Sequence, residues 1–214
     1  MNVISPIIES ICFLASLSLY FQASMPKYLK TFPFFLLITI IIEITVALFM
    51  KKNVDVILMY NIFTTFEFVF YLYLIRGIIF SVKAKKIIWW LIAIYPVLVL
   101  INAAFFQVKT FHTVTYSLGC LLIVAVCIYY FFEIFQSAHS VKLVKEPAFW
   151  ICSALLFFYT CTFPLIGLWN HLHGLPHIIL GNLNVILQLL NVLLYSLFSI
   201  AFLCRIRFRR VHSA

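Results

Sequence analysis

Residues 61 to 75 read NIFTTFEFVFYLYLI, an apolar run with one carboxyl group, Glu67, near its centre. The apolar run extends over residues 56 to 75. About 20 residues at 1.5 Å each are enough to cross the roughly 30 Å hydrocarbon core of a bilayer. The stretch therefore predicts a transmembrane helix. Because an ionisable group is costly at mid-membrane, Glu67 also predicts a functional position.

Similar runs recur throughout the chain of 214 residues, of which 65% are hydrophobic and 10% are charged. In soluble domains about a quarter of the residues are charged, so this composition indicates an integral membrane protein. The runs do not alternate with a period of two, which favours helices over a barrel. We predict a single all-α domain over residues 1 to 214, a bundle of seven transmembrane helices. Their expected ranges are residues 4 to 22, 32 to 50, 56 to 75, 87 to 106, 112 to 135, 148 to 169 and 178 to 203.

Basic residues divide unequally between the two sets of alternate helix ends. Lys51, Lys52 and Lys109 belong to one set. The other set holds 12 of the 15 lysines and arginines, namely Lys27, Lys30, Arg76, Lys83, Lys85, Lys86, Lys142, Lys145, Arg205, Arg207, Arg209 and Arg210. Short cytoplasmic loops are enriched in such residues, so we expect the N-terminus outside and the C-terminus in the cytoplasm.

The net charge of +9 is spread over these helix ends, and no separate soluble domain is present to carry it. Nucleic acid is therefore not an expected partner. Two basic groups could dock anionic lipid headgroups or a cytoplasmic or membrane protein partner, in addition to anchoring the bundle in the lipid bilayer. They comprise Lys83, Lys85 and Lys86 before the fourth span and Arg205, Arg207, Arg209 and Arg210 after the seventh.

Two carboxyl groups lie deep inside predicted spans. Glu43 and Glu67 are each about 11 residues into their helices, which places both near the bilayer midplane. Consecutive helices are usually neighbours, so we expect the two to share one site, with Glu9 lining its entrance. No lysine or arginine lies inside a span. The acids must therefore be protonated and hydrogen-bonded or hold a proton or another cation. Glu133, near the inner end of the fifth span, is expected to pair with a cytoplasmic lysine or arginine.

Helical spacing extends this polar interior along two predicted helices. Tyr60, Thr64, Glu67 and Tyr71 share one face of the third helix, and Asn184, Gln188, Asn191, Tyr195 and Ser199 share one face of the seventh. Polar faces on membrane helices point into the bundle. The set favours a polar cavity that binds a ligand or a proton, and the alternative is hydrogen-bonding glue between helices.

Four histidines gather at the expected outer face. His112 begins the fifth span, and His171, His173 and His177 lie in the last outer loop. Imidazoles bind zinc or copper, although this spacing is poor for a defined site. A plain polar loop and a pH-sensitive gate are the alternatives. No other cofactor is indicated, and the seventh helix has no lysine for a retinal Schiff base.

These features favour a sensor- or receptor-like membrane module that binds a small molecule, a cation or a lipid and signals to a partner through its basic ends. A small proton- or cation-coupled transporter is the main alternative. A structural subunit of a membrane complex and a lipid-acting membrane enzyme stay open, but no nucleophile or metal motif accompanies the acids, so an enzyme is less favoured. The absence of any Asn-x-Ser/Thr acceptor fits a bacterial cytoplasmic membrane. No motif identifies a family.

Overall fold

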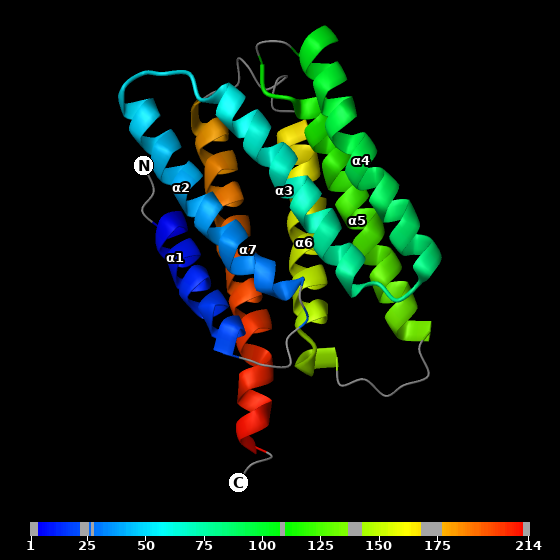
Figure 1. The fold of residues 1–214 in the computed structure, drawn as a ribbon. Helices are drawn as coiled ribbons and strands as arrows, with labels where there is room; N and C mark the ends of the chain where they lie inside the picture. The colour runs from blue at the N-terminus through cyan, green and yellow to red at the C-terminus, as the bar shows by residue number, and fades with distance from the viewer. Residues whose placement is uncertain are drawn as a thin grey trace.

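The computed structural model describes residues 4–21, 26, 28–107, 110–136, 143–167 and 177–211. These residues form seven α-helices, and no strand occurs among them (Figure 1). The helices are α1 Ile4–Leu17, α2 Phe32–Lys51, α3 Ile57–Ile78, α4 Val82–Phe105, α5 Thr113–Gln136, α6 Pro147–Gly167 and α7 His177–Val211. Three short 3-10 turns lie between them at Ser18–Phe21, Leu29–Thr31 and Leu143–Lys145. The predicted all-α class is confirmed.

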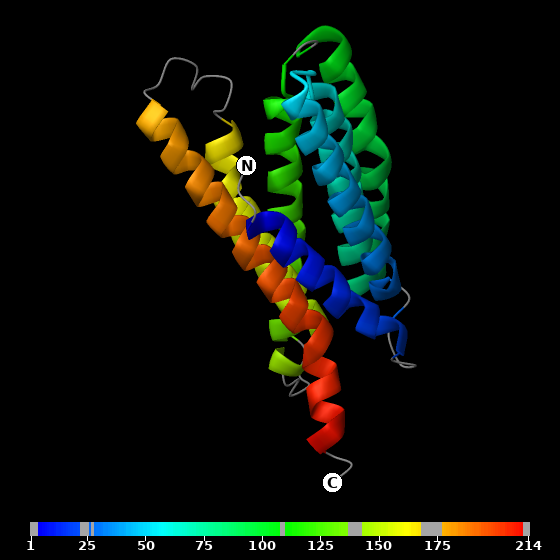
Figure 2. The same ribbon diagram turned by 90° about the vertical axis from the view of Figure 1, so that its left-hand side faces the viewer.

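Six of these helices are long and apolar enough to cross a membrane, which confirms a multi-pass membrane protein. The exception is α1, which has 14 residues where 19 were expected, and therefore rises only about 21 Å. Helix α7 is longer than expected, with 35 residues, and its end extends below the other helices in Figures 1 and 2. The count of seven spans and the orientation of the termini stay predictions.

Local sequence explains several helix boundaries. Pro33 lies in the first turn of α2, where its missing N–H leaves no hydrogen bond unmade. After α2, Asn53 adopts a positive φ of 55°. The N–H groups of Asn53 and Val54 bond back to the carbonyls of Met50 and Phe49, both at 3.1 Å, which is a Schellman cap. This tight reversal places α3 directly after α2.

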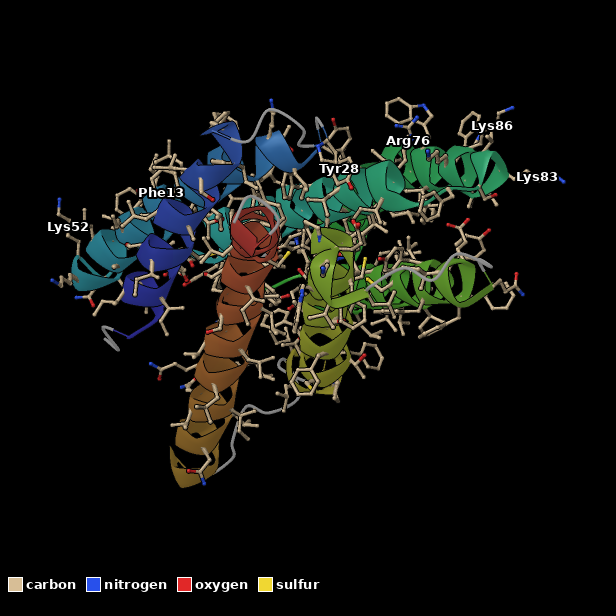
Figure 3. All side chains as sticks on the ribbon, turned by 90° about the horizontal axis from the view of Figure 1, so that it is seen from below. Phe13, Tyr28, Lys52, Arg76, Lys83 and Lys86 are labelled. Carbon is tan, nitrogen blue, oxygen red and sulfur yellow. The ribbon has the colours of Figure 1, made fainter. Side chains whose placement is uncertain are left out.

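The helices pack in an order that the chain sequence does not suggest. Helix α6 lies between α5 and α7, and α3 packs on α4 and α5. Helix α1 lies against α7 and α2, whereas α2 and α3 touch much less although they are consecutive. Figure 2 shows α1 crossing α7, and Figure 3, from below, shows it between α7 and α2. The acid-bearing helices α1, α2 and α3 therefore do not form a regular row.

Aromatic packing fixes the rotation of α3. The buried Phe68 ring contacts the rings of Tyr95, Tyr116 and Tyr159, with centroids 5.6, 5.3 and 5.2 Å away. A Cβ added to Gly119 of α5 would lie 2.7 Å from the Phe68 ring, so only glycine fits without rearrangement. Because Phe68 points toward α4 and α5 and touches Tyr159 of α6, the preceding residue Glu67 points in a different direction around α3, toward the other side of Tyr159.

A second aromatic cluster joins α2, α3 and α7. Phe35 and Phe70 stack with centroids 4.1 Å apart and an interplanar angle of 2°. Phe32 meets both Phe198 and Phe202 edge to face at 4.9 Å. Offset-stacked and edge-to-face pairs each contribute about 0.5–1.5 kcal/mol beyond area burial. Helix α2 is thus held to α3 and α7 mainly through rings near its own N-terminal half.

Polar groups close the turn between α4 and α5. The Asn61 side chain donates to the Thr110 carbonyl at 3.2 Å and accepts from the His112 backbone N–H at 3.0 Å. The Gln107 side chain accepts from the Asn102 amide at 2.9 Å. We call this set the loop-end network; it comprises Asn61, Asn102, Gln107, Thr110, His112 and Thr113. It ties the neighbouring ends of α3, α4 and α5 together.

At the opposite end, Glu133 of α5 receives two hydrogen bonds from backbone. Phe80 N–H donates to one carboxylate oxygen and Ser81 N–H to the other, both at 2.9 Å. The described residues therefore show a role other than the expected pairing with lysine or arginine. The carboxylate satisfies N–H groups at the start of α4 that have no helical partner, and its charge suits the positive end of that helix.

Candidate functional site

Three carboxyl groups meet at the side of the bundle formed by α1, α2 and α3. The carboxyls of Glu9 and Glu43 face each other within hydrogen-bonding range. Glu67 lies within electrostatic reach of both. Glu9 is 1% exposed, and no donor among the described residues reaches either of its oxygens. We call Glu9, Glu43 and Glu67 the carboxyl cluster.

Two tyrosines accompany Glu67. The hydroxyls of Tyr71, one turn along α3, and Tyr159 of α6 are directed at its carboxyl. Both tyrosines are fully buried, yet neither hydroxyl reaches a partner at regular hydrogen-bond geometry within the described chain. Glu67 itself is only half-buried. Its carboxyl group itself is enclosed by protein groups.

Helix α7 supplies the remaining neighbours. Tyr195 is buried within electrostatic reach of all three carboxyls. One turn further along, the Ser199 hydroxyl donates to the Tyr195 carbonyl at 2.8 Å and interacts with the thiol of Cys12 on α1. Cys12 is fully buried, so this contact fixes which face of α1 meets α7. Glu9 lies three residues before Cys12, on the same side of that helix.

The structure changes the expected relation between the acids. Glu43 was expected beside Glu67, with Glu9 at the entrance, but the carboxyl of Glu43 lies within hydrogen-bonding range of the carboxyl of Glu9. Glu67 interacts with Glu43 through charge only. The reason is that α1 packs against α2, whereas α2 and α3 make few contacts. The closest acid pair is therefore formed by α1 and α2.

The two polar faces predicted from spacing reach the cluster only in part. Tyr60 is 40% exposed, and the Thr64 hydroxyl donates to the Asn61 carbonyl of its own helix at 3.2 Å. On α7, Asn184 is exposed, and Gln188 and Asn191 are half-buried. Burial thus increases along α7 toward Tyr195. Tyr60 is nevertheless within electrostatic reach of Glu43, so the α3 face borders the carboxyls at both ends, and the α7 face borders them at Tyr195.

Most residues of the predicted metal site lie outside the part of the chain that the structure describes. His171 and His173, and the side chain of His177, lie outside the described residues. His112 is 8% exposed, and its imidazole bonds the Gln107 backbone carbonyl, with Nδ1 left without a partner in the described chain. Burial lowers the pKa of His112, an effect that the hydrogen bond to Gln107 opposes. Among the described residues, no three His, Cys, Asp or Glu side chains are grouped to hold a metal ion.

Basic side chains gather at the end of the bundle that carries the start of α4. Figure 3 shows Arg76, Lys83 and Lys86 at one edge and Lys52 far across the bundle. The Arg76 guanidinium lies 5.2 Å from the centre of the Trp89 ring, a cation–π contact. Lys85 is half-buried, and the side chains of Arg205, Arg207, Arg209 and Arg210 lie outside the described residues. Every described lysine or arginine side chain lies at a helix end or in a turn, so none enters the carboxyl cluster.

Sequence reasoning missed Tyr159 and Asn61. Nothing in the spacing on α6 indicated that Tyr159 faces Glu67, because the relevant neighbour is on another helix. Asn61 comes just before the Thr64–Glu67 face and could have been noticed as a polar residue in an apolar run. Its partners, Thr110 and His112, lie about 50 residues away in the chain.

Comparisons of the chain with protein-family models, curated proteins and solved structures found no match.

Proposed function

We propose that the protein is a sensor- or receptor-like membrane module in which the carboxyl cluster binds a small molecule or a cation. The observation that carries the proposal is a set of unsatisfied buried atoms: both Glu9 oxygens and the hydroxyls of Tyr71 and Tyr159. Leaving a buried polar group without a partner costs about 1–3 kcal/mol of folding free energy, so several such groups together indicate that a bound ligand completes their hydrogen bonds. A ligand that carries hydrogen-bond donors and positive charge would satisfy both oxygens and tyrosine hydroxyls.

The chemistry of the cluster favours a cation over an anion or a neutral lipid tail. Three acids meet there without a basic side chain among the described residues, so a positive ligand would replace repulsion by attraction. The hydroxyls of Tyr71 and Tyr159 and the carboxyl of Glu67 would form one wall of this binding site. An ammonium group fits this description because it offers several donors to acceptor oxygens.

The signal would pass to a partner at the basic end of the bundle. We propose that this end faces the cytoplasm of a bacterial cell, that α1 completes a seventh span and that the N-terminus is outside. The support is the positive-inside rule, applied to the 12 basic residues in one set of alternate helix ends along the sequence and the three in the other. Lys83 and Lys86 are exposed beside Trp89 and Trp90, which suits a surface at the headgroup level.

Ligand binding would be tested by thermal unfolding of the purified protein in nanodiscs. The probes are ammonium, methylammonium and tetramethylammonium ions, with sodium at equal ionic strength as the control. A bound cation at 100 times its dissociation constant adds about 2.7 kcal/mol of stability. We expect a rise in unfolding temperature with one of the ammonium probes and a loss of that rise in Glu67→Gln. An equal response in Glu67→Gln, or none with any probe, contradicts the proposal.

A proton-coupled transporter is the second candidate, favoured by one observation. The three carboxyl groups of Glu9, Glu43 and Glu67 lie within electrostatic reach of one another, and they come from three different helices. Intramembrane acids in such proximity are typical of proton relays in pumps and transporters. Proton flux into proteoliposomes would support transport, and flux that is unchanged in Glu67→Gln would remove it.

A further inference from the structure

The contact between Glu9 and Glu43 has a chemical requirement of its own. An ionised carboxylate only accepts hydrogen bonds, so two carboxyls can bond each other only if one carries a proton. No other donor in the described chain reaches the Glu9 oxygens, and Glu9 is 1% exposed. The arrangement of the two side chains is therefore complete with one proton and incomplete with none.

The neighbours of this pair offer no substitute for the proton. Four side chains interact with Glu9 or Glu43, namely Cys12 of α1, Tyr60 and Glu67 of α3 and Tyr195 of α7. Tyr71 of α3 interacts with Tyr195. Tyr159 of α6 and Ser199 of α7 follow in the next layer. All are neutral or acidic groups, and the described lysines and arginines lie at helix ends. A second negative charge in the pair would be repelled and would have no counter-charge.

The pair also joins the shortest helix to the rest of the bundle. Helix α1 has 14 residues and contacts α2 and α7, as Figure 3 shows from below. Its other face exposes Ile7, Ile11 and Leu14, with 52, 56 and 65% of their surfaces accessible. The described side chains of α1 include three buried polar or thiol groups, Glu9, Cys12 and Ser16; Glu9 faces Glu43 of α2, and Cys12 faces Ser199 of α7. We therefore expect the position of α1 to depend on the protonation of Glu9.

We propose that Glu9 and Glu43 form a one-proton binding site that holds α1 against α2. With the proton bound, the two carboxyls share a hydrogen bond and α1 stays seated. When the proton leaves, two adjacent carboxylates repel each other and α1 separates from α2. This proposal rests on the proposed function, because it concerns the same carboxyl cluster. The proton on the Glu9–Glu43 pair would regulate that cluster, and a separate ligand could still bind at Glu67.

Cys12 provides the measurement, because it is fully buried between α1 and α7. The parent protein keeps Cys12 and carries alanine at Cys120, Cys127, Cys152, Cys161 and Cys204. It would be reconstituted in nanodiscs and labelled with a small maleimide over a series of pH values. Thiols react faster with maleimide at high pH because the thiolate is the reactive form. The double variant Glu9→Gln/Glu43→Gln in the same background therefore measures the rise of the labelling rate with pH that comes from the thiol alone. Two amides bond each other without a titrating proton.

We expect Cys12 labelling of the parent to rise at least tenfold more steeply with pH than labelling of the double variant. Glu146→Gln, which changes an exposed acid outside the cluster, should follow the parent. Equal slopes in the parent and the double variant would overturn the proposal. This readout needs no ammonium ligand, so failure of ligand binding leaves it standing and failure here leaves ligand binding standing.

A second measurement on the unmodified chain covers the case in which the variants do not fold. Dicyclohexylcarbodiimide adds to protonated carboxyl groups in apolar surroundings, and the acylurea product is located by mass spectrometry of the peptides. One adduct per molecule on Glu9 or Glu43, decreasing as pH rises, is expected. No adduct on either residue at acidic pH would overturn the shared proton.

Discussion

The loop-end network and the carboxyl cluster are both polar groups in a mostly apolar bundle, yet their hydrogen bonding differs. In the network, the Asn61 and Gln107 side chains both donate and accept at 2.9 to 3.2 Å. In the cluster, Glu9 receives no donor and two tyrosine hydroxyls reach no partner among the described residues. Satisfied polar groups hold helices together, whereas unsatisfied ones mark a site that needs something else.

The difference follows from the residue types. Asn and Gln carry a donor and an acceptor on one group, so they can close a network with backbone alone. Glutamates offer acceptors, and when ionised they need donors from elsewhere. The interior of this bundle supplies a few tyrosines and no described basic side chain. Changes on the α3–α5 side should therefore alter stability, and changes in the cluster should alter binding.

The largest expected effect comes from Gly119→Leu, which breaks the packed α3–α5 side directly. The new Cβ would lie 2.7 Å from the Phe68 ring, and three tyrosine rings already surround that ring. Overpacking of this kind costs about 1–3 kcal/mol, and we expect about 3 kcal/mol because the ring has little room to move. Thermal unfolding in detergent measures it.

Gly167→Ala is the control for this change. Its Cβ would meet the Ser117 side-chain oxygen at 2.8 Å, and a hydroxyl can rotate away more easily than an enclosed ring. We expect a smaller loss than for Gly119→Leu. Equal losses would mean that the aromatic contacts do not set the rotation of α3.

The next effect is that of Asn61→Ala, which opens the loop-end network. The His112 backbone N–H would lose its acceptor in a buried position, and an orphaned group of this kind costs about 1–3 kcal/mol. Removing the exposed Asn184 in the same way should change the unfolding temperature little. A similar change in both variants would contradict a structural role for the network.

A smaller effect should come from the pH dependence of the same network. Because burial lowers the pKa of His112, the folded protein favours the neutral imidazole. In the unfolded chain the same histidine would have the ordinary pKa of about 6.5. The contribution of this group to stability is therefore complete above about 6.5 and is lost as pH falls through the lower folded pKa. Unfolding temperatures between about pH 5 and 7 should fall less in His112→Asn than in the parent. Parallel curves for the two proteins would show that His112 does not titrate this way.

The smallest expected change in stability is that of Glu67→Gln, which tests the other half of the comparison. The amide keeps an acceptor for the tyrosine hydroxyls, nearly keeps the shape of the side chain and cannot ionise, so we expect a change within about 0.5 kcal/mol or a small gain. The reverse exchange in the network, Gln107→Glu, removes the donor to Thr113 and should destabilise. If Glu67→Gln destabilises more than Gln107→Glu, the cluster is structural.

Much of the fold could be predicted because membrane helices are encoded by local runs. Six predicted spans match helices of spanning length, with most ends within a few residues. The length of α1 was overestimated, since apolar residues continue into the 3-10 turn Ser18–Phe21. Which helices are neighbours was not predictable from the runs, since helices in lipid are apolar on all sides and their faces are weakly marked.

The sequence by itself determined that acids lie inside an apolar bundle whose lysines and arginines are confined to helix ends. It also showed that these acids need a proton or a cation, because composition and spacing along one helix are local properties. Tertiary structure decided that Glu9, and not Glu67, lies within hydrogen-bonding range of Glu43, and that Tyr159 faces Glu67. Those pairings depend on how helices distant in the chain rotate and cross, and the packing of rings such as Phe68 sets that geometry.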